Sequence, residues 1–180
     1  MGNRFVVSDP GACIGCQTCM ASCLTKHDVV GDIAQPRLNL VTTLAVSSPI
    51  ACHHCQDAPC VNACPTGTLY IENDRVAIAE ERCIGCSNCV MACPFGAVTL
   101  TQISKPVTLG SLVLKGQSKP YVIKCDLCAD RVNGPACVES CPTKALVVMD
   151  AKELNASVKQ KKLEAAASME SMSSLPLASV

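Results

Sequence analysis

Cysteine is the residue that most constrains this chain, because sixteen cysteines occur within 180 residues. They fall into four groups of four, here called motifs one to four, and none is left over. In every motif two residues separate the first two cysteines and three residues separate the last two. The motifs are Cys13, Cys16, Cys19, Cys23; Cys52, Cys55, Cys60, Cys64; Cys83, Cys86, Cys89, Cys93; and Cys125, Cys128, Cys137, Cys141. This regular grouping predicts that the cysteines act together in sets.

Other material for a core is scarce. The chain has no tryptophan, two phenylalanines and two tyrosines, although large aromatic side chains usually supply much of the buried area of a core. We therefore expect the cysteines to organise the interior. Basic and acidic residues balance at fifteen each, and no nucleic-acid-binding motif or basic arm is visible, so no nucleic-acid partner is expected.

The first residues of the chain indicate the redox compartment. Before Cys13 there is no long apolar segment, twin arginine or small-residue cleavage site, so we expect a cytoplasmic location. No run approaches the roughly 20 apolar residues that span a bilayer, so direct membrane insertion is not expected. A reducing cytoplasm disfavours structural disulfides, and the cysteine motifs therefore predict metal sites.

The spacing indicates which metal group is bound. Motif three is C-x2-C-x2-C-x3-C followed by Pro94, the run that bacterial ferredoxins use for 4Fe-4S clusters. Motif one has Leu24 in place of this proline, while motifs two and four keep it at Pro65 and Pro142. In a two-cluster module the fourth cysteine of one motif ligates the other cluster, so motifs work in pairs. Four motifs therefore predict two pairs and four 4Fe-4S clusters.

Alternative uses of the cysteines fit less well. Zinc ribbons use pairs of C-x2-C and do not need a third cysteine and a C-x3-C end in every group. A disulfide framework conflicts with the expected compartment, and a redox dithiol motif would occur once and not four times. Gly15 and Gly85 support the cluster interpretation, because glycine can adopt conformations that let the backbone approach a cluster closely.

A hairpin is predicted between motifs two and three. Residues 66–78 alternate apolar and polar side chains on both sides of Asn73 and Asp74, a turn signal. Residues 52–93 should therefore form a contiguous two-cluster module. Motifs one and four would form a second module, with residues 24–51 and 95–124 as connections, but spacing alone leaves this nesting open.

The end of the chain predicts a helix outside the cysteine motifs. Residues 150–169 contain good helix formers, a candidate N-cap at Asp150, and Leu154, Val158 and Leu163 along an imperfect apolar stripe. Residues 171–180 are expected to form a loose tail. We expect the helix to dock on another subunit and to help higher-order assembly.

Several runs extend beyond the cysteines and resemble one family. They are residues 52–60, 83–86, 93–97, 124–128, 134–137 and 141–146. These runs resemble the four-cluster ferredoxin subunits of formate hydrogenlyase and the small subunits of hydrogen-dependent carbon dioxide reductase. More remotely, they are similar to the iron-sulfur subunits of nitrate and dimethyl sulfoxide reductases. The resemblance covers residues 3 to about 150.

The resemblance implies an α+β fold of two nested bacterial-ferredoxin-like modules, each binding two 4Fe-4S clusters, with a C-terminal helix. The implied outer module is discontinuous, residues 1–45 plus 105–150, the inner module is residues 46–104, and residues 151–180 form the helix and tail. The implied ligand sets are Cys13, Cys16, Cys19, Cys141 for cluster 1; Cys23, Cys125, Cys128, Cys137 for cluster 2; Cys52, Cys55, Cys60, Cys93 for cluster 3; and Cys64, Cys83, Cys86, Cys89 for cluster 4.

The resemblance also implies a function. The chain would be a non-catalytic electron-transfer subunit between a formate dehydrogenase, acting as a carbon dioxide reductase, and a hydrogenase. Their catalytic subunits are the expected partners, and other ferredoxin-like subunits are further candidates. The alternatives are an accessory protein for formate dehydrogenase maturation, or an iron-sulfur subunit of another molybdenum or tungsten oxidoreductase. An iron-sulfur sensor is a weaker third option, because no signalling motif is visible.

A few residues near the cysteines invite a role. Lys124 and Lys144 flank motif four, where a cation would favour the reduced cluster, although a solvated lysine is an equal alternative. His53 and His54 lie between two cysteines, but the implied set of four is already complete, so we expect them beside a cluster or at the surface. Met91 is expected to fill a gap in the sparse core.

Overall fold

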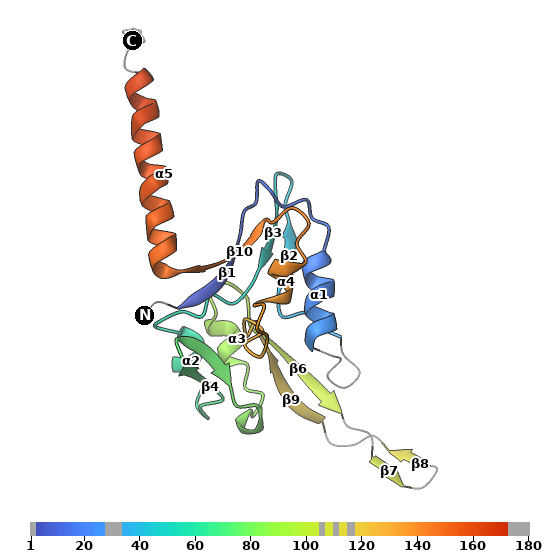
Figure 1. Cartoon of the computed structure of the whole chain (residues 1–180). Coiled ribbons are helices and arrows are strands. Elements are labelled where there is room, and N and C mark those ends of the chain that lie inside the picture. The colour runs from blue at the N-terminus through green and yellow to red at the C-terminus, as the bar shows by residue number, and fades with distance from the viewer. Residues whose placement is uncertain (1–2, 28–33, 105–106, 110–111, 115–117, 173–180) are drawn as a thin grey trace.

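The computed structural model describes residues 3–27, 34–104, 107–109, 112–114 and 118–172, as short strands and helices with one long C-terminal helix (Figure 1). The strands are β1 (Arg4–Ser8), β2 (Asn39–Thr42), β3 (Ser47–Ile50), β4 (Leu69–Glu72), β5 (Arg75–Ile78), β6 (Thr99–Ser104), β7 (Val107–Leu109), β8 (Leu112–Leu114), β9 (Ser118–Ile123) and β10 (Leu146–Asp150). The helices are α1 (Thr18–His27), α2 (Pro59–Asn62), the 3-10 helix η1 (Glu80–Arg82), α3 (Asn88–Ala92), α4 (Ala136–Glu139) and α5 (Ala151–Met172). The predicted mixture of helix and strand with a C-terminal helix is confirmed.

Strands that are far apart in the sequence bring the two ends of the cysteine region together. β1, which precedes motif one, pairs antiparallel with β10, which follows motif four, and Val6 lies opposite Val148. Among the described strands, this is one of five two-stranded sheets, all antiparallel. Motifs one and four are therefore held on the same side of the molecule.

The predicted hairpin between motifs two and three is confirmed. β4 pairs antiparallel with β5, with Leu69 opposite Ile78. The turn residues Asn73 and Asp74 have φ angles of 49° and 58°. Two successive positive φ angles are typical of the tight turns that connect strands with a right-handed twist.

The segment between motifs three and four forms a long arm. β6 and β9 pair along their whole length, with Thr99 opposite Ile123, and β7 and β8 form a small hairpin farther out (Figure 1). The sequence predicted only that residues 95–124 form a connection, so these two strand pairs are an additional feature. β6 begins shortly after motif three, and β9 ends just before motif four.

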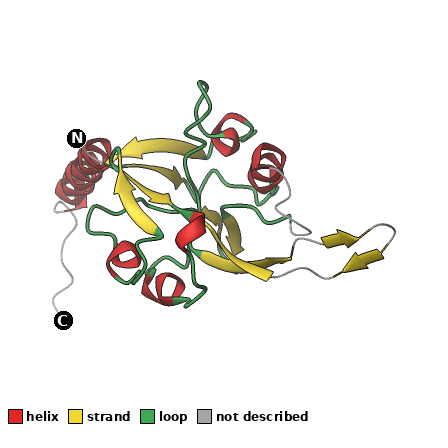
Figure 2. Cartoon of the chain, turned by 90° about the horizontal axis from the view of Figure 1, so that it is seen from below, coloured by secondary structure: helices red, strands yellow, loops and turns green. Residues whose placement is uncertain are grey.

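The short helices form two pairs. α1 contacts α4, and α2 contacts α3. These pairs lie on either side of the strands, which is visible from below in Figure 2. Each pair combines helices that carry cysteines of two different motifs, which places motif one beside motif four and motif two beside motif three.

Cysteines supply much of the interior, as predicted. Eight of the sixteen are buried. One core combines Cys19, Cys23, Cys52, Cys125 and Cys137 with small aliphatic side chains, and a second core combines Cys60 and Cys89 with another aliphatic group. The expectation that Met91 fills a gap is wrong, because its side chain is 85% exposed on the outer side of α3.

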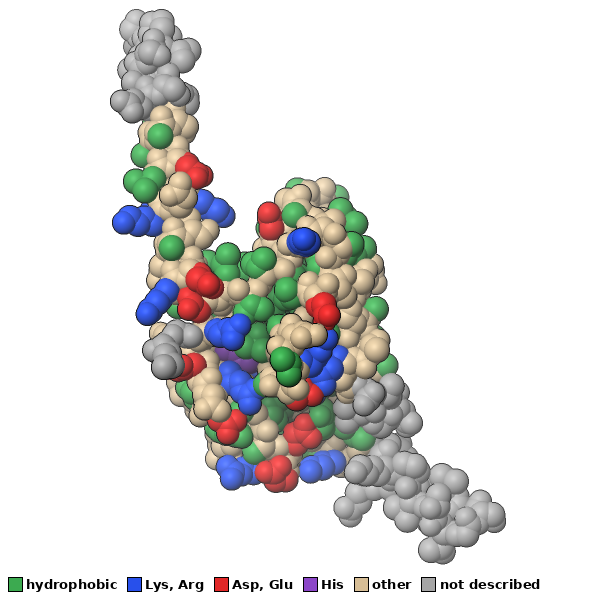
Figure 3. Space-filling model, viewed as in Figure 1, with side chains coloured by type: hydrophobic (Ala, Val, Ile, Leu, Met, Phe, Trp, Pro, Cys, Tyr) green, Lys and Arg blue, Asp and Glu red, His purple; other side chains and the backbone are tan. Residues whose placement is uncertain are grey.

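The C-terminal helix α5 projects away from the rest of the chain, with charged side chains of both signs along it (Figure 3). Its predicted N-cap is confirmed, because Asp150 Oδ1 accepts the backbone N–H groups of Lys152 and Glu153, both at 2.8 Å. The Glu153 carboxylate accepts the Asp150 N–H at 3.0 Å, which completes a capping box. The predicted tail, residues 171–180, begins too early, because residues 171 and 172 continue α5, and residues 173–180 lie outside the described part of the chain.

No helix in the described ranges combines the length and the apolar character that crossing a membrane requires.

Candidate metal centres

The sixteen cysteines are all free thiols. The structure gathers them at four places, and two of these places are cavities that four cysteines line. The first cavity is lined by Cys13, Cys16, Cys19 and Cys141, together with apolar side chains such as Leu146. Three of these sulfurs come from motif one and the fourth from motif four.

The second cavity has the same design in the other half of the cysteine region. It is lined by Cys64, Cys83, Cys86 and Cys89, together with Leu69 and Val122 among other side chains. Here three sulfurs come from motif three and one from motif two. In both cavities one cysteine is buried and one is exposed, and the lining combines apolar side chains with a few hydroxyl or amide groups.

The remaining eight cysteines form two more deeply buried groups. Cys137 interacts electrostatically with Cys23 and Cys128, and more weakly with Cys19 of the first cavity, while Cys125 interacts with Cys137 and then with Cys52. Cys60 interacts with Cys52, Cys93 and Cys55. Each group again takes three cysteines from one motif and one from another.

Burial has a large effect on these thiols. Burial, with a smaller contribution from neighbouring cysteines, raises the pKa of Cys125 and of Cys137 to about 12. It also raises the pKa of Cys60 to about 11. Such thiols would stay protonated at neutral pH, so metal binding must displace their protons and links folding to ligation.

In the second cavity the pKa of one cysteine, Cys64, is lowered instead of raised. Burial raises the pKa of Cys64, but hydrogen bonds from the Leu69 backbone, the Thr66 side chain and the backbones of Thr66 and Thr68 outweigh it and lower the pKa to about 7. The Thr68 N–H donates to Cys64 Sγ at 3.2 Å. This sulfur is therefore prepared for the thiolate form by local backbone donors.

Backbone amides donate to sulfur at several equivalent places. The amides of His54 and Leu127 donate to Cys52 and Cys125, the first cysteines of motifs two and four, both at 3.4 Å. The Ala97 N–H donates to Cys93 Sγ at 3.4 Å. Hydrogen bonds to ligating sulfur are one of the ways in which a protein adjusts the potential of an iron-sulfur cluster.

The predicted glycine conformations are confirmed. Gly15 and Gly85 have φ angles of 70° and 75°, which L side chains rarely adopt. A Cβ atom on Gly85 would also lie 3.1 Å from the side chain of Pro120 on β9. The loop of motif three therefore depends on glycine for both its backbone and its close packing.

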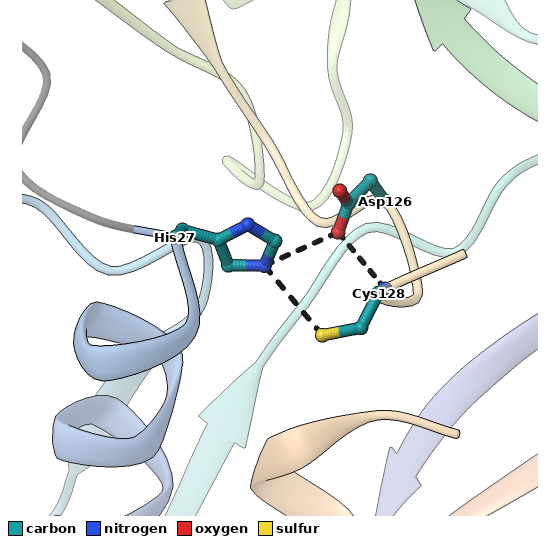
Figure 4. Close-up of side chains that lie close together, drawn as sticks. All are labelled: His27, Asp126 and Cys128. Carbon is teal, nitrogen blue, oxygen red and sulfur yellow. Dashed lines mark hydrogen bonds and ion pairs between the residues drawn. The ribbon is translucent and has the colours of Figure 1, made fainter. Parts of the chain in front are cut away.

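A polar network that the sequence did not predict borders Cys128 (Figure 4). His27 Nε2 lies 3.5 Å from Cys128 Sγ and 3.4 Å from Asp126 Oδ1, which in turn accepts the Cys128 N–H at 3.0 Å. Burial lowers the pKa of His27, and Asp126 opposes this shift. His27 lies four residues after Cys23, one helical turn along α1, and this spacing was the available sequence signal.

The two histidines of motif two have different surroundings. The His53 ring stacks between Phe5 and Phe95, with centroids 5.2 Å and 3.9 Å away. His54 is fully buried, and its Nδ1 accepts the Val76 N–H at 3.1 Å. Among the described residues its Nε2 has no hydrogen-bond partner.

These arrangements fit 4Fe-4S clusters. Each place offers four free sulfurs and nearby apolar side chains, backbone amides reach several of the sulfurs, and only the place around Cys128 adds His27 and Asp126 as further donors among the described residues. Comparison with known proteins identifies the group. A 4Fe-4S dicluster domain family matches residues 44–151, which is more than half of the chain, and another 4Fe-4S dicluster domain family matches residues 12–69.

The chain belongs to the 4Fe-4S dicluster domain family. Two dicluster domains are consistent with four clusters. Their matched ranges overlap at residues 44–69, so they do not themselves follow the nested boundaries that the resemblance implies.

Relatives of this dicluster protein are named for electron transport. The chain is 38% identical over 161 residues to the electron transport protein HydN of Escherichia coli, covering 84% of this chain and 91% of HydN. It is 36% identical over 187 residues to hydrogenase-4 component A of Escherichia coli, covering 91% of each. YsaA of the same organism, named provisionally as an electron transport protein, is 39% identical over 159 residues, covering 84% of this chain and 93% of YsaA. The dicluster protein is therefore an iron-sulfur protein related to electron-transfer proteins.

Proposed function

We propose that the chain holds four 4Fe-4S clusters and carries electrons through them between a formate dehydrogenase and a hydrogenase. The proposed sets are Cys13, Cys16, Cys19, Cys141; Cys23, Cys125, Cys128, Cys137; Cys52, Cys55, Cys60, Cys93; and Cys64, Cys83, Cys86, Cys89. The first two sets belong to the proposed outer module, residues 1–45 plus 105–150, and the last two to the inner module, residues 46–104.

The observation that carries this proposal is the origin of the sulfurs around each cavity. Cys141 joins the three cysteines of motif one, and Cys64 joins the three of motif three. This exchange of the fourth ligand between paired motifs is the arrangement of two-cluster ferredoxin modules. The contacts of α1 with α4 and of α2 with α3 support the same pairing.

The ligand chemistry favours electron transfer over substrate chemistry. A bound 4Fe-4S cluster supplies one-electron redox chemistry, and four cysteine ligands complete its coordination. The chain's own residues hold the sulfurs in place, donate backbone N–H groups to them and exclude water through apolar neighbours. The proposed role is therefore that of a carrier within a larger enzyme.

Two further observations support a redox complex as the setting. One relative is a hydrogenase-4 component and another is an electron transport protein, which favours a hydrogenase as one of the partners. In α5, Val158, Leu163 and Met169 are 40%, 56% and 71% exposed. Exposed apolar side chains on a projecting helix favour docking on another subunit. A cytoplasmic location remains part of the proposal.

The test is reduction through natural partners. The chain is purified anaerobically from its own cells under mild conditions, and formate or hydrogen is added while cluster reduction is followed by electron paramagnetic resonance. We expect stoichiometric catalytic subunits and cluster reduction by both donors, and no reduction in a control of the chain purified alone. A preparation that lacks catalytic subunits and is unaffected by either donor would contradict the proposal and favour a maturation accessory.

A further inference from the structure

Lys124 is a basic residue in the interior of the molecule. It follows β9, directly precedes Cys125, and its side chain is only 1% exposed. Its Nζ donates to the backbone carbonyl of Cys125 at 2.8 Å. Lys144, at the other end of motif four, is exposed. The two lysines that flank motif four therefore differ in burial, which the sequence alone did not predict.

A buried ammonium group needs compensation, because removing a charge from water costs several kcal/mol. Lys124 makes none of the ion pairs found among the described residues. Burial lowers the pKa of Lys124 below its usual value, and Cys52, Cys125, Asp126 and Cys60 oppose this shift without cancelling it. Three of these four groups are cysteine sulfurs, which carry negative charge as thiolates when they bind iron.

These sulfurs belong to two different proposed sets. Cys52 and Cys60 belong to one set in the proposed inner module, and Cys125 belongs to one set in the outer module. Cys125 and Cys52 interact with each other and lie in the same buried core. Lys124 is therefore located at the junction where the two modules meet.

His54, a second buried basic residue near these sulfurs, has a neutral ring. The Val76 N–H donates to His54 Nδ1, so the proton of the neutral ring is on Nε2. Because Nδ1 accepts this hydrogen bond, the fully buried imidazole beside Cys52 is neutral. Lys124, and not His54, is therefore the side chain that can carry a positive charge beside these sulfurs.

We propose that Lys124 is a fixed cation shared by two clusters, one in each module, and that it raises the reduction potential of both. The inference rests on the proposed ligand sets. A positive charge stabilises the electron added to a cluster, and in a buried site this effect is weakly screened. Lys124 would therefore help to determine the reduction potentials of the two clusters between which electrons pass from one module to the other.

The experiment compares Lys124→Met with Lys144→Met in the full chain, isolated anaerobically with its clusters. Methionine is similar in length and uncharged. The midpoint potentials of all clusters are measured by redox titration with electron paramagnetic resonance. We expect Lys124→Met to shift two of the four potentials to more negative values, by about tenfold in the reduction equilibrium, which equals about 59 mV for a one-electron couple. Lys144→Met should shift none.

Other outcomes overturn the inference. These are unchanged potentials in Lys124→Met, an equal shift of all four potentials, or the same shift in Lys144→Met. If Lys124→Met binds less iron than the wild type, Lys124→Gln replaces it, with Lys124→Arg as the variant that keeps the charge. Iron loss in all three variants would show a structural role and would also overturn the inference.

The proposed function is tested separately by the wild-type chain in the same experiment. If the wild type lacks four clusters, the proposed ligand sets fail. If it holds four clusters and Lys124→Met changes no potential, only the inference about Lys124 fails.

Discussion

Arg37 Nη1 lies 2.7 Å from Asp126 Oδ2, and this ion pair ties the chain before β2 to the loop of motif four. The backbone N–H of Arg37 donates to Cys23 Sγ at 3.2 Å. Asp126 also borders His27 and accepts the Cys128 N–H. One carboxylate therefore positions several groups around one proposed cluster site.

We predict that Asp126→Asn weakens this region. The substitution removes a charge-assisted ion pair in a half-buried place, and we expect a loss of about 1–2 kcal/mol in stability. The measurement is the urea concentration at which the anaerobic holoprotein loses its visible absorbance. Asp130→Asn is the matched control, because Asp130 pairs with Lys26 at an exposed position and should matter little. Equal effects of the two variants would contradict this account.

Gly85→Ala should be more damaging than Gly67→Ala. Both glycines have positive φ angles, but only at Gly85 would an added Cβ meet another side chain, that of Pro120 at 3.1 Å. Backbone strain alone costs about 1–2 kcal/mol, and the clash adds to it at Gly85. Iron content and the urea midpoint should both fall further in Gly85→Ala. Equal iron content and equal urea midpoints in the two variants would contradict the prediction, because they would show that the loop of motif three accommodates the added Cβ.

The stability of the folded chain should fall as the pH is lowered, and His54 should contribute to this fall. Its pKa in the folded chain is lowered to about 3, whereas an unfolded histidine titrates near 6.5. Between these values the unfolded state binds a proton that the native state does not bind. One histidine then contributes up to about 1.4 kcal/mol per pH unit, fully present above the unfolded pKa and lost as the pH falls.

The corresponding variant is His54→Gln, compared with the wild type by urea unfolding at pH values of about 7, 6 and 5. We expect the variant to show a shallower pH dependence, whatever its stability at neutral pH. The lowered pKa values of His27 and His53 are common to both proteins, so the difference isolates His54. Parallel pH profiles would exclude the assigned burial of a neutral His54 ring.

Removing α5 should reduce the size of the complex. A chain that ends before Lys152 lacks the helix, and a chain that ends after Met172 keeps it. We expect native mass measurement to show a smaller assembly for the shorter chain and an unchanged assembly for the longer one. If both chains assemble like the full protein, α5 is not a docking element.

Local patterns allowed the sequence to predict some elements correctly. The turn at Asn73 and Asp74, the glycine conformations in motifs one and three, and the cap at Asp150 each depend on a few neighbouring residues. The spacing of the cysteines likewise predicted that sulfurs from separate motifs would gather. Such features follow from covalent geometry and short-range hydrogen bonds, which a sequence displays directly.

Other features depend on contacts between distant segments. The Phe5, His53 and Phe95 stack joins three parts of the chain, and the network of His27, Arg37 and Asp126 joins three more. No local sequence pattern predicts contacts of this kind. The burial of Lys124 and the exposure of Met91 were also not predictable, because each depends on what packs against a short loop or helix.

The central claim is that the sixteen cysteines hold four 4Fe-4S clusters, and metal and electron counts on one anaerobic preparation test it most directly. Four clusters require about sixteen irons and sixteen sulfides per chain, and reduction should take up about four electrons. We predict these values for the full chain. Zinc in place of iron, or iron and electron counts that correspond to fewer clusters, would contradict the account.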